Sequence, residues 1–189
     1  MSQPLTPGHA KKSLGQHFLH DPSLLKRIAL AGGPVKGRTV IEVGPGPGGL
    51  TRALLEEGAR VIAVEMDDRF AEGLRAWPDF GTRLFLHHGD ARAVNFPELI
   101  ARSGGEQPAM IVANLPYNVA TPIITNLLVD RELRPERLVV TIQKELGDRI
   151  MAEPESPDFG ALSLLCQALA DITLVRVLPP SVFWPRPKV

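Results

Sequence analysis

The stretch IEVGPGPGGLT at residues 41–51 predicts a buried strand, a glycine-rich turn and the start of a helix. Within it, Gly44, Gly46 and Gly49 match the pattern G-x-G-x-x-G, whose glycines allow a tight turn and a close approach of the backbone to a nucleotide. Glu65 ends the next apolar run, about 20 residues further on, where an acidic side chain would meet ribose hydroxyls. The stretch therefore predicts a sheet that binds a nucleoside-containing cofactor at the carboxyl ends of its strands.

Short runs rich in Val and Ile recur along the chain and alternate with longer segments of helical spacing. The runs are residues 39–43, 60–65, 84–88, 110–113 and 137–142, with a sixth candidate at 172–178 after a helical segment at 161–170. Strands joined by helical crossovers indicate a mostly parallel sheet. We therefore expect an α/β fold with helices on both faces of the sheet.

The two ends of the chain depart from this alternation. Residues 1–12 are polar and predict a disordered or loosely attached arm. Asp21 and Pro22 predict an N-cap and a first helical position, with the helix running to about Leu30. Residues 179–187 hold four prolines and predict an extended loop, neither helix nor central strand. We divide the chain into an arm and helix at 1–35 and an α/β domain at 36–189.

Composition and charge restrict the class of protein. The 189 residues suffice for one domain with a substantial core, and 21 basic residues balance 21 acidic ones, so any nucleic-acid footprint must be local. No apolar stretch could cross a bilayer, and the N-terminus does not resemble a signal peptide. Cys166, the one cysteine, predicts a buried side chain in a reducing compartment. His87 and His88 would face opposite sides of a strand, which argues against a metal site. We expect a cytoplasmic monomer.

The turn also restricts the choice of cofactor. Pro45 and Pro47 have no backbone N–H, so the turn offers few donors to pyrophosphate, and no Lys-Ser/Thr pair follows it as in a triphosphate-binding loop. S-adenosylmethionine carries ribose and adenine but no phosphate, and its sulfonium is positive. Glu42 would place negative charge near its amino-acid part or sulfonium. Asp90, at the end of the third run, would accept from its adenine amine, although Gly-Asp is also ordinary turn chemistry.

The motif Asn114-Leu115-Pro116-Tyr117 directly follows the fourth run, which in a doubly wound sheet lies beside the strand before the glycine turn. The amine of adenine or cytosine is a poor nucleophile because its lone pair is delocalised into the ring. The Asn114 amide oxygen and the Leu115 carbonyl could accept its two N–H groups and aim the lone pair at a methyl group. Pro116 would hold this aim, and Tyr117 would stack on a splayed-out base.

These motifs resemble those of the ribosomal RNA adenine dimethyltransferases, which are Rossmann-like enzymes that use S-adenosyl-L-methionine. The matching segments are residues 12–19 (KSLGQHFL), 42–46, 65, 89–91, 114–117, 143–145 (QKE), 159–163 (FGALS, with Phe in place of Tyr) and 179–189 (PPSVFWPRPKV). The resemblance covers nearly the whole chain. It implies a Rossmann-like methyltransferase domain at residues 36–189.

The resemblance also implies roles for individual residues. The residues implied at the cofactor are His17, Leu19, Glu42, Gly44, Gly46, Glu65, Met66, Asp90, Ala91 and Asn114. The residues implied in catalysis are Asn114, Leu115, Pro116, Tyr117 and Phe183, with Phe183 stacking on the target adenine opposite Tyr117. No metal is implied.

Within the family, the closing P-K-V signature and the segment Q-H-F-L favour the bacterial branch that dimethylates two adjacent adenosines near the 3′ end of 16S rRNA, in the small ribosomal subunit or its assembly intermediate. The 23S rRNA methyltransferases of the macrolide-resistance type are the alternative. Family members continue past the position of Val189 with a last strand and a small helical domain. We therefore expect a truncated chain that is less stable than a full-length relative and whose sixth strand lies beside a gap.

Three other interpretations remain. An NAD-dependent dehydrogenase would use the same glycine pattern, but Pro45, Pro47 and the motif at 114–117 disfavour it. A DNA or protein-amide methyltransferase would use a related Asn-Pro-Pro-Tyr motif, which Leu115 and the C-terminal signature disfavour. A non-catalytic ribosome-assembly or transcription factor on this fold would bind RNA or ribosomal particles without needing Asn114.

Overall fold

The computed structural model describes residues 16–133 and 135–187. The elements, in chain order, are β1 (Phe18–Leu19), α1 (Pro22–Ala29), β2 (Thr39–Val43), α2 (Gly49–Glu56), β3 (Arg60–Glu65), α3 (Asp68–Arg75), β4 (Leu84–His88), the 3-10 helix η3 (Ala91–Ala93), α4 (Phe96–Arg102), β5 (Met110–Asn114), α5 (Ala120–Val129), β6 (Arg137–Thr141), α6 (Lys144–Ile150), α7 (Ala161–Leu169), the 3-10 helix η4 (Pro180–Val182) and β7 (Phe183–Trp184). The arm predicted at residues 1–12 lies outside the described residues. Helix α1 begins as predicted, because the Asp21 side chain accepts a hydrogen bond from the Leu24 N–H at 3.0 Å.

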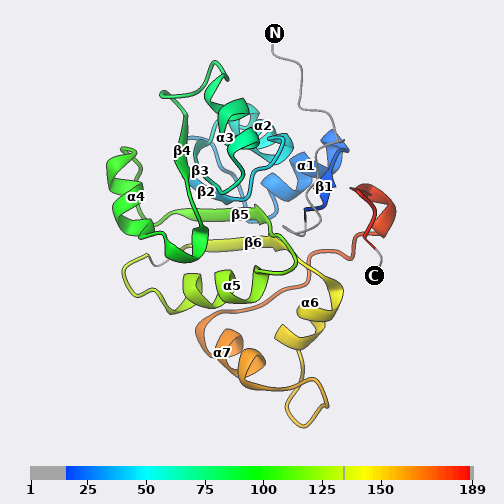
Figure 1. Ribbon diagram of the computed structural model, residues 1–189. Coiled ribbons are helices and arrows are strands. Elements are labelled where there is room, and N and C mark those ends of the chain that lie inside the picture. Colours follow the sequence, from blue (N-terminus) through cyan, green and yellow to red (C-terminus); the bar gives the residue numbers. More distant parts are fainter. Residues whose placement is uncertain (1–15, 134, 188–189) are drawn as a thin grey trace.

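Five of the predicted runs form one parallel sheet with the strand order β4-β3-β2-β5-β6 (Figure 1). The chain proceeds outward from β2 through β3 to β4 and then crosses back to β5 on the other side of β2. The strand order therefore reverses between β2 and β5. In open α/β sheets, the carboxyl ends of the strands at such a switch point form the ligand crevice.

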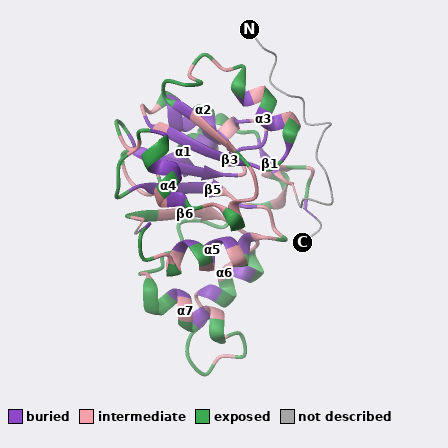
Figure 2. Cartoon of the chain, turned by 60° about the vertical axis from the view of Figure 1, so that its left-hand side comes forward, coloured by how far each residue is buried: buried purple, intermediate pink, exposed green. Residues whose placement is uncertain are grey.

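Helices cover both faces of the sheet, as predicted. On one face, alternate strand residues such as Val40 and Val61 pack against α1, α2 and α3. On the other face, Ile41 and Ile62 pack against α4 and α5, with α6 and α7 extending this layer. Strands β2 and β3 are buried almost throughout (Figure 2). The two covered faces explain why their sequences are continuous apolar runs.

Helix α7 confirms the helix predicted at 161–170, and the thiol of Cys166 is buried within the core that it shares with α5 and α6. Burial raises the pKa of this thiol. None of the helices in the described part of the chain is long and apolar enough to cross a membrane.

The segment at 179–187, predicted to be an extended loop, contains a short helix and a short strand. Residues Pro180–Val182 form a 3-10 turn, and β7 pairs antiparallel with β1, with Phe183 opposite Leu19 and Trp184 opposite Phe18. The prolines lie on either side of Phe183 and Trp184, so both of these residues keep the backbone N–H that strand pairing uses. The pairing joins segments from near both ends of the chain.

The sixth strand predicted at residues 172–178 does not form. This segment is irregular, and Leu174, Val175 and Val177 expose 58%, 71% and 54% of their surface. Its alternating apolar residues favour a strand, but a strand also needs a neighbouring backbone with which to exchange hydrogen bonds. Within residues 16–133 and 135–187, no strand pairs with it.

Candidate active site

A cleft opens at the carboxyl ends of the central strands, at the switch point between β2 and β5. Together with the solvent onto which it opens, it contains about 760 Å³ of empty space. Its lining residues are Gln16, His17, Phe18, Val43, Gly44, Gly46, Val64, Glu65, Met66, Gly89, Asp90, Ala91, Arg92, Asn114, Leu115, Pro116, Asn118, Val119 and Ile123. The cleft therefore collects residues from the ends of four successive strands and from the segment that leads into β1.

The glycine turn lines this cleft, and its backbone N–H groups already donate to acceptors of the protein. The N–H groups of Gly44, Gly46 and Gly48 donate to the Val64 carbonyl at 2.9 Å, to a Glu65 carboxylate oxygen at 2.9 Å and to the Pro45 carbonyl at 3.0 Å. Pro45 and Pro47 have no N–H to offer. No backbone donor between residues 44 and 48 is therefore left for a phosphate group.

Glycine is required at position 46 for two reasons. Its φ is +54°, a left-handed conformation that is costly for other residues, and a Cβ there would lie 2.6 Å from the Phe18 ring. The absence of a side chain thus lets β1 close over the turn.

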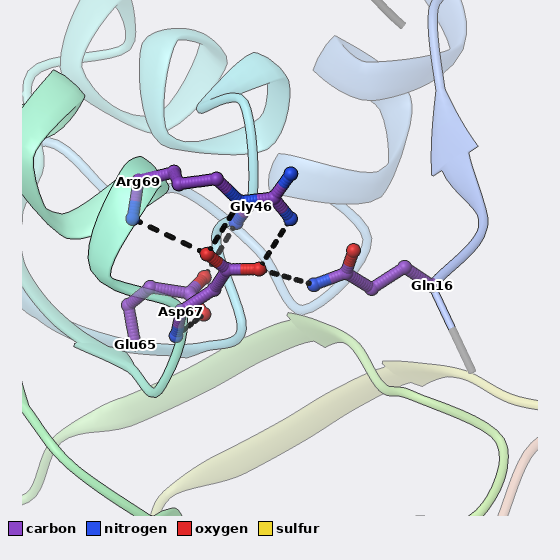
Figure 3. Close-up of polar contacts among 5 residues, drawn as sticks. All are labelled: Gln16, Gly46, Glu65, Asp67 and Arg69. Carbon is purple, nitrogen blue, oxygen red and sulfur yellow. Dashed lines mark hydrogen bonds and ion pairs between the residues drawn. The ribbon is translucent and has the colours of Figure 1, made fainter. Parts of the chain in front are cut away.

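Glu65 is almost fully buried at the end of β3, and each of its carboxylate oxygens accepts one backbone N–H (Figure 3). Oε2 accepts from Gly46 at 2.9 Å and Oε1 from Asp67 at 2.8 Å. Burial raises the pKa of Glu65, and these backbone bonds oppose the rise. The carboxylate is held rigidly at the edge of the cleft, where its remaining lone pairs can accept hydroxyl groups.

Asp67 extends this network to the segment before β1. Its buried carboxylate accepts from the Arg69 guanidinium at 2.6 and 2.9 Å and from the Gln16 amide at 3.4 Å (Figure 3). The Arg69 hydrogen bond holds the pKa of Asp67 well below its usual range. The network thereby links Gln16, through Asp67 and Glu65, to the glycine turn.

Glu42 lies beneath the turn and is not among the residues that line the cleft. Its carboxyl is 1% exposed and accepts a hydrogen bond from the Thr51 hydroxyl at 2.7 Å. Burial raises the pKa of Glu42 to about 8, with a further contribution from the nearby Glu65. The raised pKa favours the protonated form of this group, and the negative charge that the sequence suggested near a sulfonium stays a prediction.

Asp90 lines the cleft after β4, as predicted, and Arg92 binds it closely. The Arg92 backbone N–H, Nε and Nη2 donate to the Asp90 carboxylate at 2.6 to 3.0 Å. This partner lowers the pKa of Asp90. The carboxylate caps η3, and four hydrogen bonds from Arg92 engage both of its oxygens.

Asn114 is the last residue of β5, and both the nitrogen and the oxygen of its side-chain amide are hydrogen-bonded. Its nitrogen donates to the His17 carbonyl at 2.7 Å, and its oxygen accepts from the Thr141 hydroxyl at 2.5 Å. Thr141 ends β6 directly opposite Asn114 in the sheet. The side chain is therefore anchored by a neighbouring strand and by the segment before β1.

Tyr117 lies outside the lining of the cleft and stacks on His17, with ring centroids 4.8 Å apart and planes inclined at 28°. Burial raises the pKa of Tyr117. Nδ1 of His17 donates to the Pro185 carbonyl at 2.6 Å. His17 therefore connects the motif at 114–117 with the segment after β7.

The structure brings most of the predicted site residues together. Those that line the cleft are His17, Gly44, Gly46, Glu65, Met66, Asp90, Ala91, Asn114, Leu115 and Pro116. Leu19, Glu42, Tyr117 and Phe183 do not line it, and Phe183 instead packs at the core on the α1 side of the sheet. The contributions of Arg92 and Thr141 were not predicted. Thr141 could have been found by aligning the ends of the fourth and fifth runs, because adjacent parallel strands end side by side.

Among the described residues, no group of three or more His, Cys, Asp or Glu side chains is placed to hold a metal ion. His88 instead contacts Asp68 at 2.9 Å.

The sheet order and the cleft at its switch point define a Rossmann-like methyltransferase fold. The structure is similar to that of a dimethyladenosine transferase from Plasmodium falciparum, with a TM-score of 0.75, 26% identity and coverage of 90% of this chain and 59% of that one. It also resembles the 23S rRNA methyltransferase ErmE in fold, with a TM-score of 0.67, 24% identity and coverage of 91% and 66%. The fold class predicted from the sequence is confirmed.

The chain belongs to the ribosomal RNA adenine dimethylase family, whose sequence model matches residues 8–189. It is 47% identical over 180 residues to the ribosomal RNA small subunit methyltransferase A of Phenylobacterium zucineum and 45% identical over 181 residues to that of Caulobacter vibrioides. These alignments cover 95% of this chain and 61% and 68% of the two relatives. The chain thus spans roughly three fifths to two thirds of their length, and the family resemblance seen in the sequence is confirmed.

Proposed function

We propose that this chain is the methyltransferase core of an enzyme that dimethylates N6 of two adjacent adenosines near the 3′ end of 16S rRNA, with S-adenosyl-L-methionine as methyl donor. The observation that carries the proposal is the anchored amide of Asn114 in the cleft at the switch point of the sheet. The relatives named as small-subunit methyltransferases, at 45 to 47% identity, support 16S rRNA as the substrate.

The cleft fits a phosphate-free nucleoside. The glycine turn has no spare N–H between residues 44 and 48, which disfavours the pyrophosphate of NAD. Glu65 would accept the ribose hydroxyls, Asp90 would accept from the adenine amine, and Met66, which is 49% exposed in the cleft, would pack against the adenine ring. When bound, S-adenosyl-L-methionine supplies a methyl group that is activated by its sulfonium.

The motif residues would prepare the target amine. The Asn114 amide oxygen uses one lone pair for Thr141 and has a second for an amine N–H, and the Leu115 carbonyl would accept the other N–H. This pairing draws the nitrogen lone pair out of the ring plane and aims it along the line of transfer. The N–C bond would form as the methyl–sulfur bond of the donor breaks, and the nitrogen, now cationic, would then release a proton to water. A general base is therefore not required before transfer.

Aromatic side chains would hold the base. His17 covers one face of Tyr117, so the base would stack on the other face. Phe183 remains part of the proposal as a second stacking ring. It pairs with Leu19 and packs on the α1 side of the sheet, so its ring would have to turn toward the cleft to reach the base. We assign catalysis to residues 36–189, with the segment 1–35 contributing His17 and Leu19, and we expect a cytoplasmic monomer that acts on the small subunit or its assembly intermediate.

Methyl transfer tests the proposal directly. Small ribosomal subunits that lack the dimethylation are incubated with the chain and labelled S-adenosyl-L-methionine, and the RNA is analysed by nucleoside mass spectrometry. We expect N6,N6-dimethyladenosine in 16S rRNA. Asn114→Ala should reduce transfer at least about 100-fold, because the amine loses an acceptor and its alignment.

The matched control is Asn126→Ala, which makes the same change at an exposed position of α5 and should leave transfer unaltered. Modification of 23S rRNA alone would reassign the substrate. Binding to subunits without any transfer, unchanged by Asn114→Ala, would favour a non-catalytic assembly factor instead.

A further inference from the structure

Thr141 is the one side chain outside the cleft lining whose hydroxyl bonds directly to the amide of Asn114 in the described structure. We propose that Thr141 is a positioning residue that holds the Asn114 amide and the Leu115 backbone in register for the target amine. This inference rests on the proposed function, because it names the residue that sets the geometry of the same site.

The amide of an asparagine can rotate by half a turn with little change in shape, so its orientation depends on its partners. The His17 carbonyl can only accept, and it therefore fixes the NH₂ end of Asn114 toward β1. The oxygen then faces Thr141, whose hydroxyl donates to it. In the opposite orientation, two oxygens would face each other at His17, and the NH₂ group would face the N–H groups of the substrate.

Thr141 is well built for this task. It is the Cα partner of Asn114 in the pairing of β5 with β6, so the sheet itself sets the separation of the two side chains. Its β-branched side chain has a restricted χ1 angle, which keeps the hydroxyl in place. Its backbone carbonyl also accepts from the Leu115 N–H at 3.2 Å. One residue thus restrains both groups that we propose to bind the amine.

In this proposal the Thr141 hydroxyl does not contact the substrate, and Asn114 does. It occupies one lone pair of the amide oxygen, and the second remains for the substrate. The hydrogen bonds of Thr141 go to Asn114 and Leu115 and not to Glu65 or Asp90, so its removal should affect the alignment of the amine more than the binding of the cofactor. The expected signature is a loss in kcat without a matching loss in cofactor affinity.

The test compares Thr141→Val, which keeps the shape and removes the hydroxyl, with Thr141→Ser, which keeps the hydroxyl. We expect Thr141→Val to lower kcat about 10- to 100-fold, and Thr141→Ser to retain most of it. Thr141→Ala serves as a second hydroxyl-free variant if the Val variant folds poorly. Thr82→Val is the matched control, because the Thr82 hydroxyl bonds only the Asp79 carbonyl in an exposed turn.

A second readout does not depend on activity. The side-chain ¹⁵N–¹H resonances of Asn114 should move in Thr141→Val and stay in Thr141→Ser. If the parent chain transfers no methyl group but these resonances move as expected, the positioning role stands and the proposed function fails. Unmoved resonances in Thr141→Val would overturn the positioning role, and so would equal kcat in the Val and Ser variants of a parent chain that does transfer methyl groups.

Discussion

The imidazole of His17 stacks on the ring of Tyr117 at a centroid distance of 4.8 Å while its Nδ1 donates to the Pro185 carbonyl at 2.6 Å. Its backbone carbonyl also accepts from Asn114. A single residue near the start of the described chain therefore contacts the motif at 114–117 twice and the C-terminal segment once. Its ring nitrogen Nδ1 must carry a hydrogen, because a carbonyl can only accept.

Replacing His17 by Phe should keep the stack on Tyr117 but remove the hydrogen bond to Pro185. A net loss of about 1 kcal/mol for this bond corresponds to about fivefold faster local opening. Hydrogen exchange measured by mass spectrometry should show faster exchange at Phe183 and Trp184, and His17→Ala should increase it further. Equal exchange in the parent chain and both variants would show that His17 does not hold β7.

Gly46→Ala should destabilise the chain more than Gly81→Ala. Both glycines have positive φ, +54° and +79°, but a Cβ at Gly46 would lie 2.6 Å from Phe18, whereas a Cβ at Gly81 would meet nothing within 4 Å. The Gly81 variant therefore measures backbone strain alone. The clash should cost about 1–3 kcal/mol more, lowering the melting temperature by a further ~2–10 °C. Equal melting temperatures for the two variants would mean that Phe18 and β1 can move away from the new Cβ without a cost in stability.

Glu42→Gln should change how stability depends on pH. The pKa of Glu42 is about 8 in the folded chain, against an ordinary value of 4.5. Between these values the unfolded chain releases a proton that the folded chain keeps, so this group's contribution to stability is complete below pH 4.5 and is lost as pH rises through 8.

An amide at position 42 can still accept from the Thr51 hydroxyl and has no such titration. The free energy of unfolding of Glu42→Gln should therefore rise relative to the parent by up to about 1.4 kcal/mol per pH unit across this interval. Urea unfolding at pH 5, 6, 7 and 8 measures the difference. A difference that is constant with pH would place the folded pKa of Glu42 near its ordinary value.

Glu65→Gln should weaken binding of S-adenosyl-L-methionine. Both carboxylate oxygens accept backbone N–H groups, so the amide NH₂ of glutamine would face a donor at either Gly46 or Asp67. The free and the bound chain both carry the cost of that unsatisfied donor, so the loss of affinity comes from the uncharged, weaker acceptor that glutamine offers to the ribose hydroxyls. A loss of about 1–3 kcal/mol corresponds to about a 5- to 150-fold higher dissociation constant. Isothermal titration calorimetry measures it, with Glu72→Gln on the exposed face of α3 as control. Unaltered affinity would remove Glu65 from the cofactor site.

Local sequence patterns predict much of the fold. The elements that they do not predict depend on pairing with residues that are distant in the sequence. The five apolar runs of the parallel sheet became its five strands. The central strands β2, β3 and β5 are buried on both faces, and the edge strands β4 and β6 are partly exposed. The run at 172–178 has the same composition, yet it stays irregular because pairing depends on a neighbour and not on propensity. The strand β7 was missed for the converse reason, since its two residues have a partner far away in sequence.

The site shows the same division. Gly44, Glu65, Asp90 and Asn114 follow strands, and the carboxyl edge of a parallel sheet brings such residues together whatever their loops do. The surroundings that tune them were not predictable from spacing. Burial raises the pKa of Glu42, the Arg92 guanidinium donates hydrogen bonds to the Asp90 carboxylate, and the Thr141 hydroxyl donates to the Asn114 amide. Each depends on side-chain packing between elements that are separate in the sequence.

The contact between His17 and Pro185 spans 168 positions of the chain, and this has a consequence for how the protein is made. Synthesis runs from the N-terminus, so β1 emerges long before the residues with which it pairs. The glycine turn, Glu65 and Asn114 can assemble on the growing chain, but the hydrogen bond that holds the His17 ring cannot form until Pro185 has left the exit tunnel. The site is therefore completed late in translation, after nearly all of this sequence has been read.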